Sequence, residues 1–168
     1  EISACLVGSE MCIRDRSGVM GITMADSLSV AERSLRMSQI RSSNTQPELK
    51  LRSEMHKHGF RFRLHRKDLP GRPDVVFPSK KTAIFINGCF WHGHHCRIGH
   101  IPKSNSQFWT QKIQANRKRD ARKIRELRVL GWKVHIVWEC SLQSQARFEQ
   151  TVEYLKVSLT RKNKGYGI

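Results

Sequence analysis

Two cysteines, three histidines and two aromatic residues lie within NGCFWHGHHC, residues 87–96. Thiolate and imidazole are the ligand groups that zinc prefers, and a closed structural site needs four of them in a tetrahedron. Cys89, His94 and Cys96 supply three of the four in a C-x4-H-x-C spacing, and Cys140 is a candidate for the fourth. These residues therefore predict a structural zinc site of three cysteines and one histidine.

The spacing alone leaves the histidine ligand open, because His92 and His95 compete with His94. It also allows buried structural cysteines among surface histidines, although three histidines crowded between two cysteines favour a metal. A bound metal would hold the loop of residues 87–105, which is too long and too polar to keep one shape unaided.

The charge of the chain is the second feature that limits its function. The 168 residues include 31 Lys and Arg against 14 Asp and Glu, a formal net charge of +17. Such a charge usually serves a polyanionic partner, so nucleic acid is the first candidate and an anionic membrane surface the second. No apolar run approaches the roughly 20 residues that span a bilayer, and we expect no membrane association.

The elements that must position these residues predict one α/β domain. Thr45 and Glu48 have the spacing of a capping box at the start of a helix that ends near Gly59. Periodicity predicts helices over 24–44, 45–58, 106–130 and 139–159, and strands over 61–65, 74–78, 82–87 and 132–138. If the last strand pairs with 82–87, Cys140 comes to lie beside the start of the metal-binding loop.

We expect residues 24–160 to form this single domain. Residues 1–23 show neither a hydrophobic period nor the basic region and cleavage site of a signal peptide. We interpret them as a non-native or disordered extension before a start at Met24, and residues 161–168 as a basic tail.

Several segments, taken in order, resemble the very short patch repair (Vsr) DNA mismatch endonucleases. They are LPGRPDVVF (69–77), FINGCFWHGHHC (85–96), FWTQKI (108–113), RD (119–120) and GWKVHIVWEC (131–140). The resemblance implies a restriction-endonuclease-like fold of the PD-(D/E)xK type, with a central mixed β-sheet flanked by helices and a structural zinc site. It also implies an Mg²⁺-dependent endonuclease that nicks duplex DNA 5′ to the thymine of a T:G mismatch left by deamination of 5-methylcytosine.

The resemblance assigns the chemistry to a few residues. Asp74 would hold Mg²⁺ together with the backbone carbonyl of Ile86, although an Asp that only caps a strand is common. His92 would act as general base or acid, with Asp120 orienting its ring and stabilising its charged form. Glu48 matches an acid near the metal, and its local alternative is the capping box.

The same resemblance makes His94 the preferred zinc ligand, with Cys89, Cys96 and Cys140, and leaves His95 outside the site. The strand of residues 82–87 lacks the second acid and the lysine that many PD-(D/E)xK enzymes carry there, as Vsr-type proteins also do.

Aromatic residues are expected to contact the bases. Phe90 and Trp91 on an exposed loop, and Trp109 on the long helix, would insert into the base stack beside the mismatch, where a wobble pair lowers the cost of unstacking. Basic residues of the long helix would attract the phosphates: Lys112, Arg117, Lys118, Arg119, Arg122, Lys123 and Arg125.

Two other functions fit the same composition. One is a non-catalytic zinc-dependent DNA-binding module, which has no need of Asp74 or His92. The other is a related PD-(D/E)xK nuclease with a different DNA target. The resemblance favours a monomer bound to DNA in the bacterial cytoplasm, with mismatch-repair proteins as possible partners.

Overall fold

The computed structural model describes residues 35, 43–101 and 106–161. The helix expected within 24–44, the extension over 1–23 and the tail beyond Arg161 lie outside the described residues, apart from the helical Leu35 and residues 43 and 44. The main elements are α3 (Gln46–Lys57), β1 (Arg63–Leu64), β2 (Val75–Phe77), β3 (Thr82–Asn87), α4 (Ser106–Val129), β4 (Lys133–Trp138) and α5 (Gln145–Thr160). Short 3-10 turns precede β3, lie within the loop that follows β3, and follow β4.

The strands form one mixed sheet in the order β1-β2-β3-β4. β1 and β2 are antiparallel, as are β2 and β3, whereas β3 and β4 run parallel. This confirms the predicted mixed sheet and the pairing of residues 132–138 with 82–87. β1 is shorter than the predicted strand over 61–65, because only Arg63 and Leu64 pair with β2.

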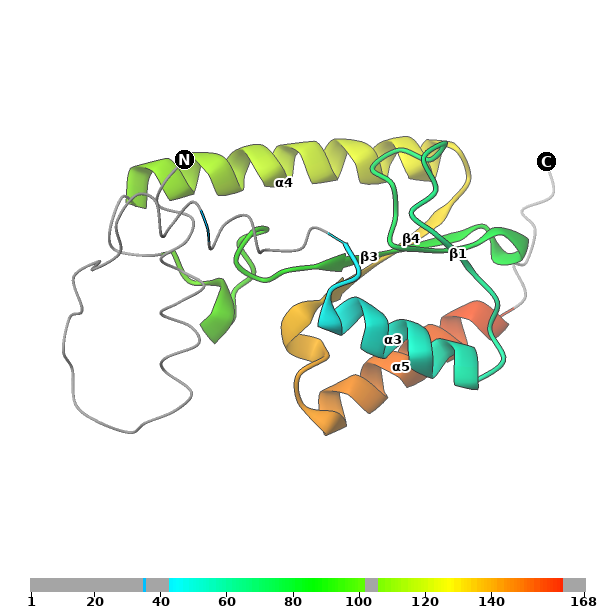
Figure 1. Ribbon diagram of the computed structural model, residues 1–168. Helices are drawn as coiled ribbons and strands as arrows, with labels where there is room; N and C mark the ends of the chain where they lie inside the picture. Colours follow the sequence, from blue (N-terminus) through cyan, green and yellow to red (C-terminus); the bar gives the residue numbers. More distant parts are fainter. Residues whose placement is uncertain (1–34, 36–42, 102–105, 162–168) are drawn as a thin grey trace.

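Helices cover both faces of the sheet. Figure 1 shows α4 along one face and α3 with α5 along the other. Successive residues of a strand point to opposite faces, so Val75 and Phe77 enter the larger core beneath α3 and α5, while Val76 packs toward α4. The larger core includes Leu51, Met55, Ile84, Val137, Phe148, Val152, Leu155 and Leu159.

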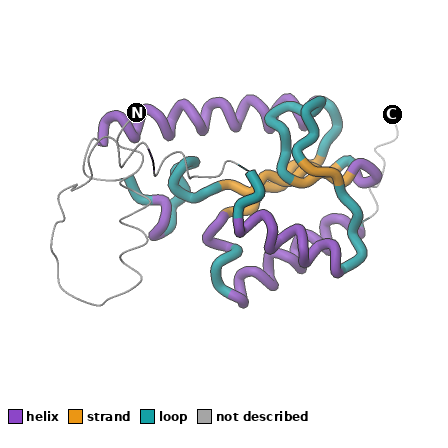
Figure 2. Tube along the Cα trace, in the orientation of Figure 1, coloured by secondary structure: helices purple, strands orange, loops and turns teal. Residues whose placement is uncertain are grey.

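The face beneath α4 is packed at one end only. There Leu69, Val76, Ala83 and Leu127 form a smaller buried cluster. In Figure 2 the loop between β1 and β2 reaches from the sheet to the C-terminal part of α4. The other end of this face carries a cavity. No helix within the described residues is long and apolar enough to cross a membrane.

The predicted helical region over 139–159 begins differently in the structure. Residues Glu139–Ser141 form a 3-10 turn, and α5 starts only at Gln145. Ser144 is the N-cap, with its Oγ accepting from the backbone N–H of Arg147. The turn therefore holds Cys140 directly at the end of β4 instead of carrying it into a helix.

Candidate active site and metal centre

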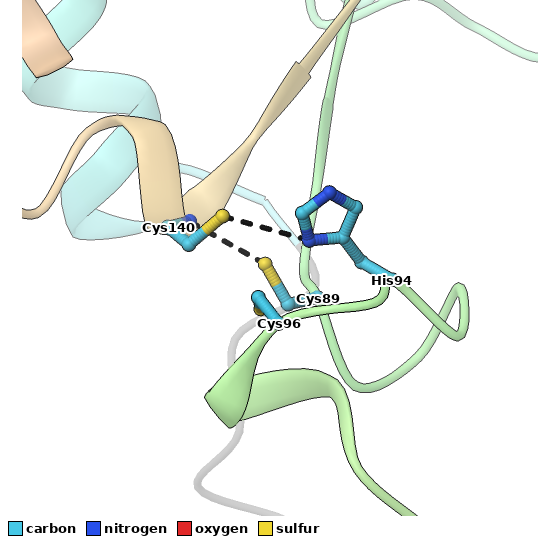
Figure 3. Close-up of side chains that lie close together, drawn as sticks. All are labelled: Cys89, His94, Cys96 and Cys140. Carbon is cyan, nitrogen blue, oxygen red and sulfur yellow. Dashed lines mark hydrogen bonds between the residues drawn. The ribbon is translucent and has the colours of Figure 1, made fainter.

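The parallel pair β3 and β4 brings the cysteines together. Asn87 and Trp138 are register partners at the ends of the two strands, and Cys89 and Cys140 each follow two residues later. Cys89, His94, Cys96 and Cys140 place one ligand atom each within 4.8 Å of one another, as Figure 3 shows. The backbone N–H of Cys140 donates to the Cys89 sulfur at 3.4 Å.

Among the three histidines of the loop, His94 lies at this cluster. Its Nδ1 is 3.5 Å from the Cys140 sulfur, and its ring stacks on Trp138 at 4.3 Å between centroids. His95 is exposed, and His92 turns toward α4, where its Nδ1 is 2.5 Å from Asp120. The structure therefore separates three histidines whose spacing alone did not distinguish them.

The backbone around the cluster is tightly folded. The N–H of His94 donates to the carbonyl of Cys89, and the N–H of Cys96 donates to that of His94, both at 2.9 Å. A Cβ added at Gly99 would lie 2.0 Å from the His94 carbonyl oxygen, so only glycine fits. A Cβ at Gly93, where φ is +63°, would lie 2.6 Å from Ile113 of α4.

The thiols are electrostatically dissimilar. Burial raises the pKa of Cys89 far above its ordinary value. Burial also raises the pKa of Cys96, but hydrogen bonds from Cys89 and from the backbone of Ile98 and Gly99 outweigh it and leave that pKa lowered. Because thiolates are the metal-binding form, a cation bound here has to displace the proton of the buried Cys89. The donor set of three sulfurs and one imidazole fits zinc.

The predicted carboxylates lie at one wall of the cavity beneath α4. Asp74 precedes β2, and its Oδ2 accepts from the Ile86 N–H of β3 at 2.8 Å. Burial raises the pKa of Asp74, the Ile86 hydrogen bond partly offsets this, and the negative charge of Glu48 adds to the rise. A negative carboxylate beside Asp74 disfavours its ionised form, and a bound cation would offset that repulsion.

Glu48 lies at the start of α3 and on the wall of the cavity, the two places that the alternatives of the sequence require. It is 3% exposed. Its Oε2 accepts from the backbone N–H of Asn44 at 3.0 Å, and its Oε1 accepts from the Thr45 hydroxyl at 2.9 Å. Thr45 makes no capping bond to the backbone, so the bonds of Glu48 tie the segment before the helix to its first turn without forming the full capping box, and Glu48 also lines the cavity.

His92 and Asp120 form the opposite wall. Their hydrogen bond joins the metal-binding loop to the middle of α4, and Asn116 adds a second link by donating to the carbonyl of Trp91 at 2.9 Å. The cavity between the two walls measures about 1080 Å³, and its lining includes Glu48, Asp74, Ile86, His92, Asp120 and Glu139. All four predicted catalytic side chains therefore line one cavity.

The expectation that the loop aromatics lie exposed is wrong for Phe90, and Trp109 of the long helix is buried with it. They are 5% and 1% exposed, respectively, because four rings pack edge to face across the loop and α4. Centroids are 4.9 Å apart for Phe90 and Trp109, and 5.2 Å apart for both Phe90 and Trp91 and for Phe108 and Trp109. Trp91 is half-buried and lines the cavity.

Sequence reasoning missed three polar residues around the site. Glu139 accepts from the Cys89 N–H at 3.3 Å and lines the cavity, so it touches both regions. Arg52 forms a buried ion pair with Glu48, and its i,i+4 spacing was a usable signal. His65 lies 3.8 Å from Asp74, and nothing in its local sequence indicated this.

Known proteins resemble this chain over most of its length. A family model described as DNA mismatch endonuclease Vsr matches residues 25–98. The type II nicking enzyme V.XorIIP of Xanthomonas oryzae pv. oryzae is 54% identical over 126 residues, which cover 75% of this chain and 93% of the relative. The chain belongs to the Vsr family.

Two further relatives support this membership. The type II nicking enzyme V.NmeAIP of Neisseria meningitidis is 46% identical, over 73% of this chain and 88% of the relative. The DNA mismatch endonuclease Vsr of Escherichia coli is 43% identical, over 74% of this chain and 80% of the relative. Membership in the Vsr family confirms the predicted restriction-endonuclease-like fold and identifies the protein as a DNA endonuclease.

Proposed function

We propose that this endonuclease nicks duplex DNA 5′ to the thymine of a T:G mismatch that arises from deamination of 5-methylcytosine. One observation carries the proposal: the Asp74–Glu48 pair and the His92–Asp120 pair face the same cavity, whose volume is about 1080 Å³. A cavity with acids on one wall and an oriented imidazole on the other suits metal-assisted hydrolysis of a phosphodiester. A relative named for mismatch cleavage and others named as nicking enzymes agree with it.

Mg²⁺ fits the acidic wall, because Asp74 and Glu48 supply carboxylate oxygens and the charge of Glu48 raises the pKa of Asp74. We assign its binding to Asp74, Glu48 and the backbone carbonyl of Ile86. When bound, Mg²⁺ neutralises charge on the scissile phosphate and activates water. Asp74 itself is held for this role by the N–H of Ile86, which fixes one of its two oxygens.

His92 is the residue to which we assign proton transfer. With Asp120 accepting at Nδ1, the neutral ring carries its proton on that nitrogen and leaves the lone pair on Nε2. That tautomer suits a general base, and the protonated ring suits a general acid. Asp120 acts as the positioning partner, because α4 holds it at a fixed place beside the loop.

The Cys3His cluster serves this chemistry indirectly. We assign Zn²⁺ to it, as a structural ion that fixes the loop carrying His92 and Trp91. The aromatic residues Phe90, Trp91 and Trp109 would contact the base stack, and this requires the ring cluster to open when DNA binds. Exposed basic side chains on α4 would bind phosphates: Lys112, Arg117, Lys118, Arg119, Arg122 and Arg125. We expect a monomer that acts on DNA in the bacterial cytoplasm.

The test compares two duplexes that differ in one base pair. The protein is incubated with Mg²⁺ and strand-labelled DNA carrying T:G in a methyltransferase-like context, beside the same duplex with T:A. We expect one cut, on the 5′ side of the mismatched thymine, and an intact T:A duplex. Equal cutting of both duplexes would indicate another DNA target, and no cutting of either would contradict the proposed activity.

A further inference from the structure

Behind the acidic wall of the cavity lie two residues that the proposed mechanism does not use, Arg52 and His65. Arg52 is 6% exposed and is the one Lys or Arg among the buried residues of the described ranges. A buried guanidinium persists only when its surroundings compensate for the lost hydration. Its partners therefore indicate what it is for.

Arg52 has three partners, and one is a proposed metal ligand. Its Nη2 donates to Glu48 Oε2 at 2.5 Å, and its Nη1 donates to Asn44 Oδ1 at 2.6 Å. The same Nη2 lies 3.0 Å from Nε2 of His65. The planar fork of the guanidinium thus fixes the Glu48 carboxylate and the His65 ring relative to each other.

His65 continues this chain of contacts to the second carboxylate. Arginine is only a donor, so Nε2 of His65 accepts, and the ring proton of the neutral imidazole sits on Nδ1. Nδ1 lies 3.8 Å from Asp74 Oδ1, and Nε2 lies 4.0 Å from Glu48 Oε2. The ring therefore lies beside both carboxylates and presents its N–H toward the Asp74 oxygen that Ile86 does not hold.

The backbone at His65 supports a positioning role. Its φ is +45°, in the left-handed region that residues other than Gly, Asn and Asp rarely adopt. Such a conformation persists when surrounding structure determines it, and it occurs often at functional sites. Here it occurs at the end of β1, directly after Leu64, and it directs the ring toward the acidic wall.

We propose that Arg52 and His65 are positioning residues that set the separation and orientation of Glu48 and Asp74 and thereby tune the affinity of the site for its divalent cation. This inference rests on the proposed function for the position of the cation site. Partners behind metal ligands typically change metal affinity or activity by about 10- to 100-fold when they are removed. If Arg52 and His65 only tied α3 to the segment after β1, their removal would leave metal affinity unchanged.

The experiment measures binding of Mn²⁺, an oxygen-preferring stand-in for Mg²⁺, to the zinc-loaded protein without DNA. Free Mn²⁺ is followed by electron paramagnetic resonance, and binding that survives in Asp74→Ala is subtracted. We expect His65→Gly and Arg52→Met each to raise the dissociation constant by about tenfold or more. His65→Gly relieves the backbone strain, so loss of the ring is its main effect.

Conservative variants separate positioning from charge. His65→Asn replaces the imidazole with an amide that still donates and accepts hydrogen bonds, and Asn tolerates a positive φ. We expect it to bind Mn²⁺ more tightly than His65→Gly does. Arg52→Lys keeps the charge but lacks the fork, and we expect it to bind as poorly as Arg52→Met. Matched controls are His58→Ala, an exposed histidine paired with Glu54, and Arg63→Met on exposed β1. Neither should change Mn²⁺ binding.

Several results would overturn the inference. Unchanged Mn²⁺ binding in His65→Gly would show that the ring does not position the carboxylates. Tighter binding in Arg52→Met would show that Arg52 merely repels the cation. Absence of any binding that depends on Asp74 would remove the site itself. Thermal melting and zinc content identify a variant that fails to fold. If an Arg52 variant fails to fold, the comparison of His65→Gly with His65→Asn tests the inference. The T:G against T:A comparison stays independent, since it reports the substrate and not the cation.

Discussion

The Cys3His cluster and the acidic wall lie close together at the end of β3, yet they are built in opposite ways. The four ligands of the cluster contact one another and a tightly turned backbone. Glu48 and Asp74 instead depend on groups that are not proposed ligands, namely the side chains of Arg52 and His65 and the N–H of Ile86. A self-contained cluster suits an ion that stays bound, whereas carboxylates held from outside suit an ion that takes part in a reaction.

The largest expected effect on activity comes from neutralising Asp74. Asp74→Asn still accepts the Ile86 hydrogen bond but removes a metal ligand, so we expect nicking to fall by more than about a thousandfold. Zinc content should stay at the wild-type level. The matched control is Asp68→Asn, an exposed acid paired with Arg66, which should retain wild-type nicking. Comparable nicking by the two variants would show that Asp74 has no special role.

His92 provides the second comparison, because it shares a loop with the cluster but not its proposed role. We expect His92→Asn to lower the nicking rate by about 10²- to 10⁴-fold through loss of proton transfer, with unchanged zinc content. His95→Asn in the same loop alters an exposed side chain and should change little. A fall in zinc content in His92→Asn would move this residue into the metal cluster instead.

Removing a ligand of the cluster should affect folding before chemistry. In Cys140→Ser we expect zinc content to fall and the melting temperature to drop by about 5–10 °C, as loss of a ligand bound at about 100 times its dissociation constant implies. Cys12→Ser, in the segment that we interpret as an extension, should change neither quantity. Metal analysis and differential scanning calorimetry measure both. Full zinc content in Cys140→Ser would contradict a four-ligand site.

The smallest expected effect is a gain in thermal stability when Asp74 is neutralised, in contrast to the loss expected for Cys140→Ser. Folding raises the pKa of Asp74 above its ordinary value of 3.8. Such an acid stabilises the folded state at a pH below its ordinary pKa, and this stabilisation is lost as the pH rises through the folded pKa. At neutral pH without added Mg²⁺, Asp74→Asn should therefore melt about 2–4 °C higher than wild type. The difference should shrink as the pH approaches 4. A lower melting temperature at neutral pH would contradict it.

The same contrast explains what the sequence could predict. Cysteine and histidine are rare ligand types with a diagnostic spacing, so Cys89, Cys96, Cys140 and a histidine of the same loop were recognisable before any fold was known. Only the family resemblance preferred His94 among the three histidines. Acids are common, and Asp74 stood out only through the family resemblance. The mixed sheet followed from apolar runs whose lengths and turns were clear, apart from the short β1.

Tertiary contacts account for what the sequence did not predict. The aromatic residues of the loop looked exposed because a local pattern cannot show that α4 supplies Trp109 to a ring cluster. His65 depends on a left-handed backbone and on α3, neither of which its own segment specifies. The position of Glu48, bonded to the segment before α3 and lining the cavity, could not be read from its local spacing.

The most direct test of the division between the two sites is the metal dependence of nicking. The zinc-loaded protein is mixed with the T:G duplex, first without any other divalent cation and then with Mg²⁺, and the nicked strand is quantified over time. Our account predicts a folded protein that does not nick with zinc alone and nicks when Mg²⁺ is added. Nicking at the same rate with zinc alone would contradict it, because the cluster would then suffice for the chemistry.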